Sequence, residues 1–174
     1  MQYKKGYALG KDMSYLTDKN LVRFWDIDGV LCVYGFGSDG IQACDDACFQ
    51  DFIKEHDIYA EASPIPFIHE FMERYTVCAH NYIVSRVESD YEEERKRAFV
   101  DKYYGKYISQ DHIFFVRDDN KSDVIKHVLN TCYAGVEETR HCIIDDTVGV
   151  LDRVQKDGLS GVHISSLLLF ARLG

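Results

Sequence analysis

Short apolar runs alternate with amphipathic stretches along the chain. The apolar runs predict five strands, over Leu21–Asp26, Asn81–Val84, Ile113–Val116, His141–Ile144 and Val162–Ile164. The amphipathic stretches predict five helices, over Ile41–His56, Ile65–Tyr75, Glu88–Tyr104, Ser122–Tyr133 and Val148–Lys156. Strands that alternate with helices form parallel sheets whose two faces are covered by helices. We therefore predict a three-layer α/β fold.

Local signals mark some of the predicted helix ends. Ser63 followed by Pro64 predicts a capping residue and a proline at the first helical position. Gly158 follows a helix that is predicted to end at Lys156, as is common at carboxyl ends. The segment Ser165–Gly174 predicts a short closing helix whose leucines pack on the sheet.

Length and composition indicate one globular domain over residues 1–174, because a chain of 174 residues can bury a sizeable core. Hydrophobic residues make up 46% of the chain and charged residues 28%, as in ordinary globular proteins. The net charge of −9 argues against a nucleic-acid partner, because phosphate backbones bind basic surfaces.

The chain also lacks signals for export or membrane insertion. No run approaches the roughly 18 apolar residues of a membrane span, and the first residues contain no apolar core of a secretory signal. We expect a cytoplasmic protein without a membrane partner, in which the six cysteines are reduced thiols.

Polar side chains stand just after four of the predicted strands: Asp26 and Asp28, Ser85, Lys121, and Asp145 with Asp146. Ligands of open α/β sheets bind at the carboxyl ends of the strands, so these side chains should converge. Carboxylates gathered in one crevice repel each other unless a cation is present, and oxygen ligands suit Mg²⁺. A metal and a lysine would in turn favour a phosphate group.

The spacing of Asp26 and Asp28 suits a reaction on that phosphate. In an extended segment, residues two apart point to the same side. One carboxylate can then attack phosphorus while the other, in its protonated form, donates to the leaving group. The pattern predicts covalent catalysis assisted by general acid–base transfer.

Taken in order, Asp26-x-Asp28-Gly-Val-Leu, Ser85, Lys121 and Asp145-Asp146 resemble the four motifs of the haloacid dehalogenase superfamily. The resemblance covers residues 21 to about 164 and implies a Rossmann-like sheet. It also implies the phosphatase branch, because members that act on carbon–halogen bonds lack the acid found here at position 28.

The resemblance implies a role for each motif residue. Asp26 would be the nucleophile and form an aspartyl phosphate, and Asp28 would protonate the leaving alcohol and later activate water. Ser85 and Lys121 would bind the phosphoryl group, and Lys121 would also pair with Asp26. Arg86, just after Ser85, is a candidate contact to the substrate.

The same resemblance implies a Mg²⁺ site. Asp145 and Asp146 would hold the ion together with Asp26 and the backbone carbonyl of Asp28. The substrate would be a small-molecule phosphate monoester, with a nucleotide as the first candidate. Little room is left for an inserted cap, so residues 41–60 would form a minimal one, and both a monomer and a homo-oligomer stay open.

Two alternatives compete with the hydrolase. A receiver-like signalling module also gathers acidic residues, a lysine and Mg²⁺ in a parallel α/β crevice, but its lysine follows the fifth strand and Lys121 comes earlier. A protein with the same fold could also bind ligands without catalysis. A phosphoenzyme that lasts for minutes would favour the signalling module.

Overall fold

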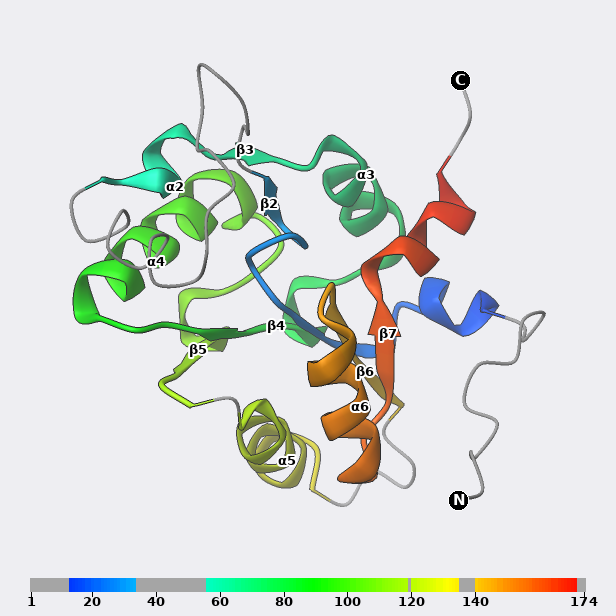
Figure 1. The fold of residues 1–174 in the computed structure, drawn as a ribbon. Helices are drawn as coiled ribbons and strands as arrows, with labels where there is room; N and C mark the ends of the chain where they lie inside the picture. Colours follow the sequence, from blue (N-terminus) through cyan, green and yellow to red (C-terminus); the bar gives the residue numbers. More distant parts are fainter. Residues whose placement is uncertain (1–12, 34–55, 119, 135–139, 172–174) are drawn as a thin grey trace.

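The computed structural model describes residues 13–33, 56–118, 120–134 and 140–171 (Figure 1). Within these ranges, five strands form a parallel sheet in the order β5-β4-β1-β6-β7. In chain order they are β1 (Val22–Trp25), β4 (Asn81–Arg86), β5 (Ile113–Val116), β6 (His141–Asp145) and β7 (Gly161–His163). Each strand overlaps a predicted one, and the predicted α/β fold class is confirmed.

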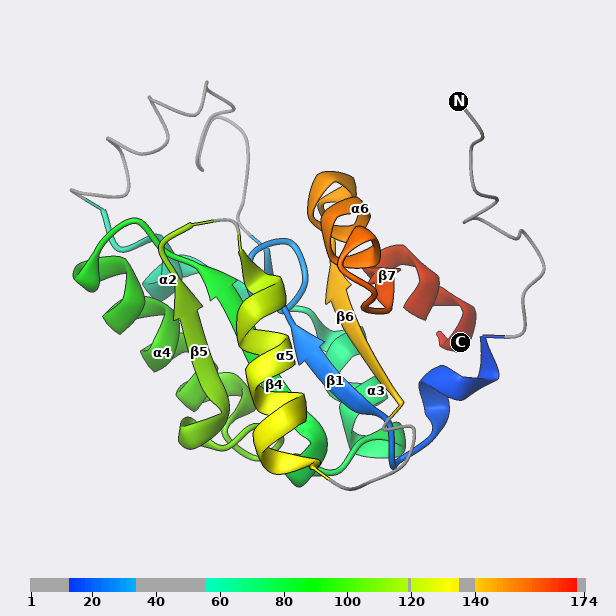
Figure 2. The same ribbon diagram turned by 90° about the horizontal axis from the view of Figure 1, so that it is seen from below.

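Helices cover both faces of this sheet. Figures 1 and 2 show α3 (Pro66–Tyr75) and α4 (Asp90–Tyr104) on one face, and α5 (Lys121–Cys132) and α6 (Val148–Lys156) on the other. Shorter elements are α2 (Ile58–Glu61) and the 3-10 helices η1 (Ser14–Thr17), η2 (Cys78–His80), η3 (Gln110–His112) and η4 (Ile164–Phe170). None of the described helices has the length and apolar character needed to cross a bilayer.

The central strand β1 joins two core layers, because successive side chains of a strand point to opposite faces. Trp25 belongs to the layer under α3 and α4, and its ring lies 6.2 Å from that of Phe71. Phe24 belongs to the layer under α5 and α6 and stacks on Tyr82 at 5.4 Å. All four side chains of β1 are fully buried, so the strand holds Asp26, the residue after Trp25, in a fixed place.

A second, two-stranded sheet corrects the predicted start of α3. Strand β3 (Ser63–Pro64) pairs antiparallel with β2 (Cys32–Val33). Ser63 is therefore not a helix cap, and the proline at the first helical position is Pro66, after the capping residue Ile65. At the other helix end singled out, Gly158 has φ +84° and its N–H donates to the carbonyl of Gln155 at 3.1 Å, which confirms that prediction.

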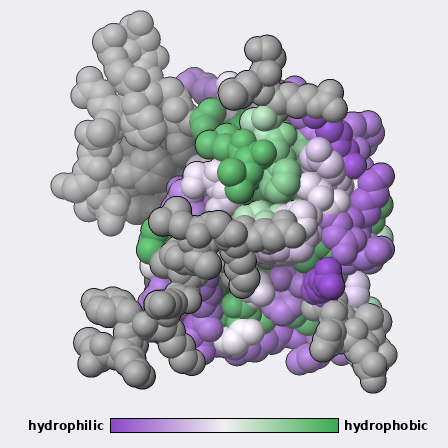
Figure 3. Space-filling model, turned by 90° about the vertical axis from the view of Figure 1, so that its right-hand side faces the viewer, coloured by the Kyte–Doolittle hydropathy of each residue, from purple (hydrophilic) through white to green (hydrophobic). Residues whose placement is uncertain are grey.

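The closing segment is a 3-10 helix, η4, where a closing helix was predicted over Ser165–Gly174. Leu167 of η4 is fully buried, whereas Leu168 and Leu169 are 60% and 70% exposed. The side of the molecule that carries η4 shows a patch of apolar surface (Figure 3). Leu167 thus attaches η4 to the core, as predicted, and the next two leucines face outward.

The predicted helix over 41–56 and most of the predicted cap over 41–60 lie outside the described residues. Within the described part of the cap, α2 begins at Ile58. Its capping residue is Asp57, whose side chain accepts from the N–H of Ala60 at 3.0 Å. The partly buried Asp57 is a typical helix cap, since it satisfies a backbone donor of the first turn.

Candidate active site

Asp26 lies at the carboxyl end of β1 and is followed by a tight turn. Its N–H donates to the carbonyl of Ile144 on β6, which continues the sheet by one step. The carbonyl of Ile27 then accepts from the N–H groups of Leu31 and Cys32, at 2.8 and 3.1 Å. This turn bends the chain back at Gly29, which has φ +68°, a conformation that glycine adopts without strain.

Lys121, the first residue of α5, joins the ends of β1 and β6. Its Nζ lies 3.0 Å from Oδ2 of Asp26 and 2.8 Å from Oδ2 of Asp145. The side chains of Lys121 and Asp145 are 4% and 0% exposed. The structure thus brings Lys121 to Asp26, the pairing that the resemblance implied.

Burial and charge act in opposite directions on these groups. Burial disfavours the charged form of Lys121, but Asp26 and Asp145 outweigh it and raise the pKa of the ammonium. Burial, assisted by Asp26, raises the pKa of Asp145 against the effect of Lys121. The lysine therefore stays charged, while the second carboxylate is held in a place that favours a further cation.

Asp26, Asp145 and Asp146 form a candidate metal site. Each can offer one oxygen within 4.8 Å of the others. Oδ1 of Asp26 is buried and has no hydrogen-bond partner among the described residues. A buried carboxylate oxygen without a donor is costly unless a cation or ligand meets it. These hard oxygen ligands fit Mg²⁺.

The side chain of Asp28 lies outside this group and is held from two other directions. Nζ of Lys96, on α4, is 2.7 Å from its Oδ2. The hydroxyl of Tyr59, on α2, donates to its Oδ1 at 2.9 Å. Desolvation and the neighbouring Asp26 raise the pKa of Asp28, and Lys96 and Tyr59 reduce that rise without reversing it. The carboxyl is thus biased toward the protonated form that an acid catalyst needs.

Ser85 and Arg86 end β4 at the same edge of the sheet. Ser85 is fully buried, and its Oγ lies 3.4 Å from Nζ of Lys96. The guanidinium of Arg86 is about half exposed and forms an ion pair with Glu88. Arg86 therefore already has a carboxylate partner, and its predicted contact to the substrate stays a prediction.

Sequence reasoning missed Lys96 and Glu92, and it missed the contact of Tyr59 with Asp28. Glu92 and Lys96 form an ion pair at 3.0 Å, one helical turn apart, which is a common surface pattern. The available signal was their register, because Phe99 and Val100 follow on the same helix face and are buried. Charged residues on an apolar helix face indicate a buried polar network.

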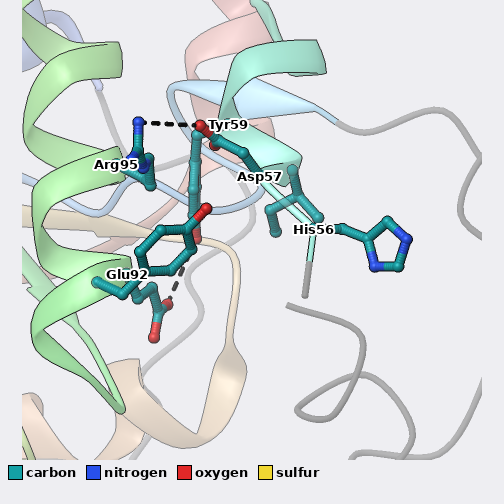
Figure 4. Close-up of a pocket in the computed structure, with 7 residues that line it drawn as sticks. His56, Asp57, Tyr59, Glu92 and Arg95 are labelled. Carbon is teal, nitrogen blue, oxygen red and sulfur yellow. Dashed lines mark hydrogen bonds and ion pairs between the residues drawn. The ribbon is translucent and has the colours of Figure 1, made fainter. Parts of the chain in front are cut away.

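Tyr59 also lines a small hollow between α2 and α4 (Figure 4). In this view Arg95 pairs with Asp57 at 3.4 Å, and the hydroxyl of Tyr59 points to Glu92, also at 3.4 Å. The same hydroxyl contacts Asp28. Tyr59 thus connects the wall of this hollow to the candidate site.

The strand order separates this fold from a receiver. When the strands of the main sheet are numbered 1 to 5 along the chain, their order across the sheet is 3-2-1-4-5, which is the Rossmann order. Receivers have the flavodoxin-like order, in which the second strand lies at the edge. Lys121 follows β5, the third strand of the sheet, and not the fifth. Both features argue against the receiver-like alternative.

Comparison with solved structures supports the same fold. The chain is similar to a hydrolase of the haloacid dehalogenase-like family from Streptococcus pneumoniae, with a TM-score of 0.51 and 15% sequence identity. The similarity covers 82% of this chain and 83% of that one. The fold is therefore the Rossmann-like α/β fold seen in that hydrolase. The sequence matches no protein-family model and no curated protein.

Proposed function

We propose that the protein is a Mg²⁺-dependent phosphohydrolase of the haloacid dehalogenase superfamily that acts on a phosphate monoester through an aspartyl phosphate. One observation carries the proposal. Lys121 bridges Asp26 and Asp145 in a buried setting. The second oxygen of Asp26 has no hydrogen-bond partner in the described part of the chain and lies near Asp146. A carboxylate that is oriented by one oxygen and open at the other suits a nucleophile.

In this proposal Asp26 attacks phosphorus, and the bond from phosphorus to the ester oxygen breaks. Asp28 gives its proton to that oxygen, so the alcohol leaves neutral. Asp28 then takes a proton from water, the water oxygen bonds to phosphorus, and the acyl phosphate bond breaks to release Asp26 and inorganic phosphate. Lys121 and the Ser85 hydroxyl contact the phosphoryl oxygens and offset their charge.

When bound by Asp26, Asp145 and Asp146, Mg²⁺ would supply positive charge beside the phosphoryl group. The charge balance supports a cation here. Among the described residues, the metal site gathers three carboxylates against the single ammonium group of Lys121, an excess of two negative charges, from Asp26, Asp145 and Asp146. A divalent ion held by Asp26, Asp145 and Asp146 would offset that excess and so favour an anionic substrate.

We further propose a cytoplasmic enzyme for a small phosphate ester, with a nucleotide as the first candidate. Arg86 would exchange its partner Glu88 for the substrate. Residues 41–60 would act as the minimal cap.

The function is tested with p-nitrophenyl phosphate. We expect turnover with Mg²⁺ and no turnover in excess chelator. Asp26→Asn should lose both the turnover and the acid-stable phosphoenzyme. Asp111→Asn is the matched control, because Asp111 is exposed and stands before β5, away from the carboxyl edge. Undiminished activity in Asp26→Asn overturns the mechanism, and Mg²⁺ binding without any turnover favours a non-catalytic binding protein.

A further inference from the structure

We propose that Lys96 is a positioning residue that fixes Asp28 and Ser85 relative to each other. The inference rests on the proposed function, because it assigns Lys96 to the acid and the phosphoryl contact of that reaction. Lys96 stands in the middle of α4 and is 1% exposed. Its nearest neighbours in sequence are charged, and only its register with Phe99 and Val100 distinguishes it from a surface lysine.

Within the described ranges, four acceptors surround the ammonium of Lys96, which has only three N–H groups to share among them. Its Nζ lies 2.7 Å from Oδ2 of Asp28 and 3.0 Å from Oε1 of Glu92, and it donates to the carbonyl of Arg86. Oγ of Ser85 is the most distant of the four, at 3.4 Å. Since a lysine can only donate, Ser85 accepts from it and keeps its own O–H to donate to a phosphoryl oxygen.

Both oxygens of Asp28 are held from outside their own loop. Lys96 holds Oδ2, and Tyr59 donates to Oδ1. The Lys96 ammonium also lies 5.7 Å from the centre of the Tyr59 ring. Two contacts from two helices leave the carboxyl group little freedom to rotate, which is what a group that must meet first a leaving oxygen and then a water requires.

Glu92 anchors Lys96 to the segment after β4. Its Oε2 accepts from the N–H of Glu88 at 2.8 Å, while Oε1 pairs with Lys96. The buried ammonium of Lys96 thus contacts three segments: the end of β4, the start of α4 and the turn after β1. Burying charged groups costs free energy, and apolar residues of similar volume often stabilise a fold at least as much as a buried ion pair does. A purely structural role would therefore not require this lysine.

The test compares Lys96→Met/Glu92→Gln with the wild-type protein. The double variant removes the lysine and its anionic partner on α4 together, so that no carboxylate is left unpaired within the helix. Lys96→Met alone could fail to fold, and Tyr59→Phe is a second, independent variant that removes only the hydroxyl at Oδ1 of Asp28. Lys102→Met is the matched control, an exposed lysine of the same helix.

The substrates are phenyl phosphate, whose leaving group needs a proton, and p-nitrophenyl phosphate, whose leaving group departs more readily without one. We expect kcat/KM for phenyl phosphate to fall about 100-fold or more in the double variant, the range of general acid catalysis, and that for p-nitrophenyl phosphate to fall less than about tenfold. Tyr59→Phe should change the same ratio in the same direction by a smaller factor.

A general loss of structure would lower both values together and leave their ratio unchanged. An unchanged ratio in both variants, with the wild-type protein active, therefore overturns the role of Lys96 and leaves the hydrolase intact. Absence of hydrolysis in the wild-type protein overturns the proposed function and this inference with it.

Discussion

Gly29 leaves the space that the carboxylate of Asp146 occupies: a Cβ atom at position 29 would lie 2.3 Å from Oδ2 of Asp146. Gly29 also has φ +68°, where a side chain adds strain of about 1–2 kcal/mol. Gly29 therefore allows the turn after β1 to pass close to Asp146, a candidate metal ligand.

Gly29→Ala should accordingly displace Asp146. We expect Mg²⁺ affinity to fall at least about tenfold, within the range seen when the surroundings of a metal ligand change. Unfolding free energy should fall by about 1–2 kcal/mol through the strained backbone. Metal titration and chemical denaturation measure the two effects. Gly149→Ala is the control, since a Cβ at this helical position meets nothing within 4 Å. Equal behaviour of the two variants would contradict the prediction.

Asp28→Asn should separate substrates by leaving group. An amide cannot supply the proton, so kcat/KM for phenyl phosphate should fall about 10²–10⁴-fold. The value for p-nitrophenyl phosphate should fall much less. Because Asp28 also activates the water in the second step, hydrolysis of the phosphoenzyme should become slow, and one equivalent of p-nitrophenol should appear in a burst. Steady-state and rapid-mixing assays measure both. The same loss with both substrates would mean that Asp28 is chiefly structural.

Mg²⁺ should raise the melting temperature. At about 100 times the dissociation constant a ligand adds about 2.7 kcal/mol of stability, which corresponds to roughly 5–10 °C for a domain of this size. Asp146→Asn should lose most of this rise, because Asp146 is exposed and contributes mainly an oxygen ligand. Asp152→Asn, on the surface of α6, is the control and should keep it. A full Mg²⁺ shift in Asp146→Asn would remove Asp146 from the site.

His69 should make stability depend on pH. Its ring lies 4.5 Å from that of Tyr104, and its Nε2 is buried with no hydrogen-bond partner in the part of the chain that the structure describes. Burial lowers the pKa of His69 below its ordinary value of 6.5. A lowered pKa means that the folded state favours the neutral ring. The resulting stability is present above about pH 6.5 and is lost as the pH falls through the folded pKa.

His69→Phe keeps an aromatic ring and removes this titration. Chemical denaturation at several values between about pH 7.5 and pH 5 measures both proteins, a span centred on the ordinary pKa of histidine. The wild-type protein should lose more stability than His69→Phe as the pH falls. Two parallel pH profiles would show that His69 does not contribute.

The strands and the convergence of their polar ends could be predicted because both follow from local pattern and from one geometric rule. Buried strands of a parallel sheet are continuous apolar runs, and their carboxyl ends meet at one edge. Asp26, Lys121 and Asp145 therefore lie together as expected. The error at Ser63 arose because a cap signal is local, whereas pairing with Val33 depends on a distant segment.

The network around Lys96 could not be predicted for a related reason. The pattern of charges in α4 is that of an exposed helix, and only the position of α2 and of the turn after β1 decides that Glu92 and Lys96 are buried. The register with Phe99 and Val100 marks a buried helix face, but it does not tell that Lys96 meets Asp28, which lies 68 residues earlier in the chain.

The strand order also has a consequence for biosynthesis. The central strand β1 ends at Trp25, but its two neighbours begin at Asn81 and His141. At ribosomal rates of about 5–20 residues per second, about 6–24 seconds pass between the emergence of β1 and that of β6. During this interval the four side chains of β1, all buried in the folded protein, have no complete sheet to pack in. Asp26, the proposed nucleophile, can therefore join Lys121 and Asp145 only after the chain has been synthesised past β6.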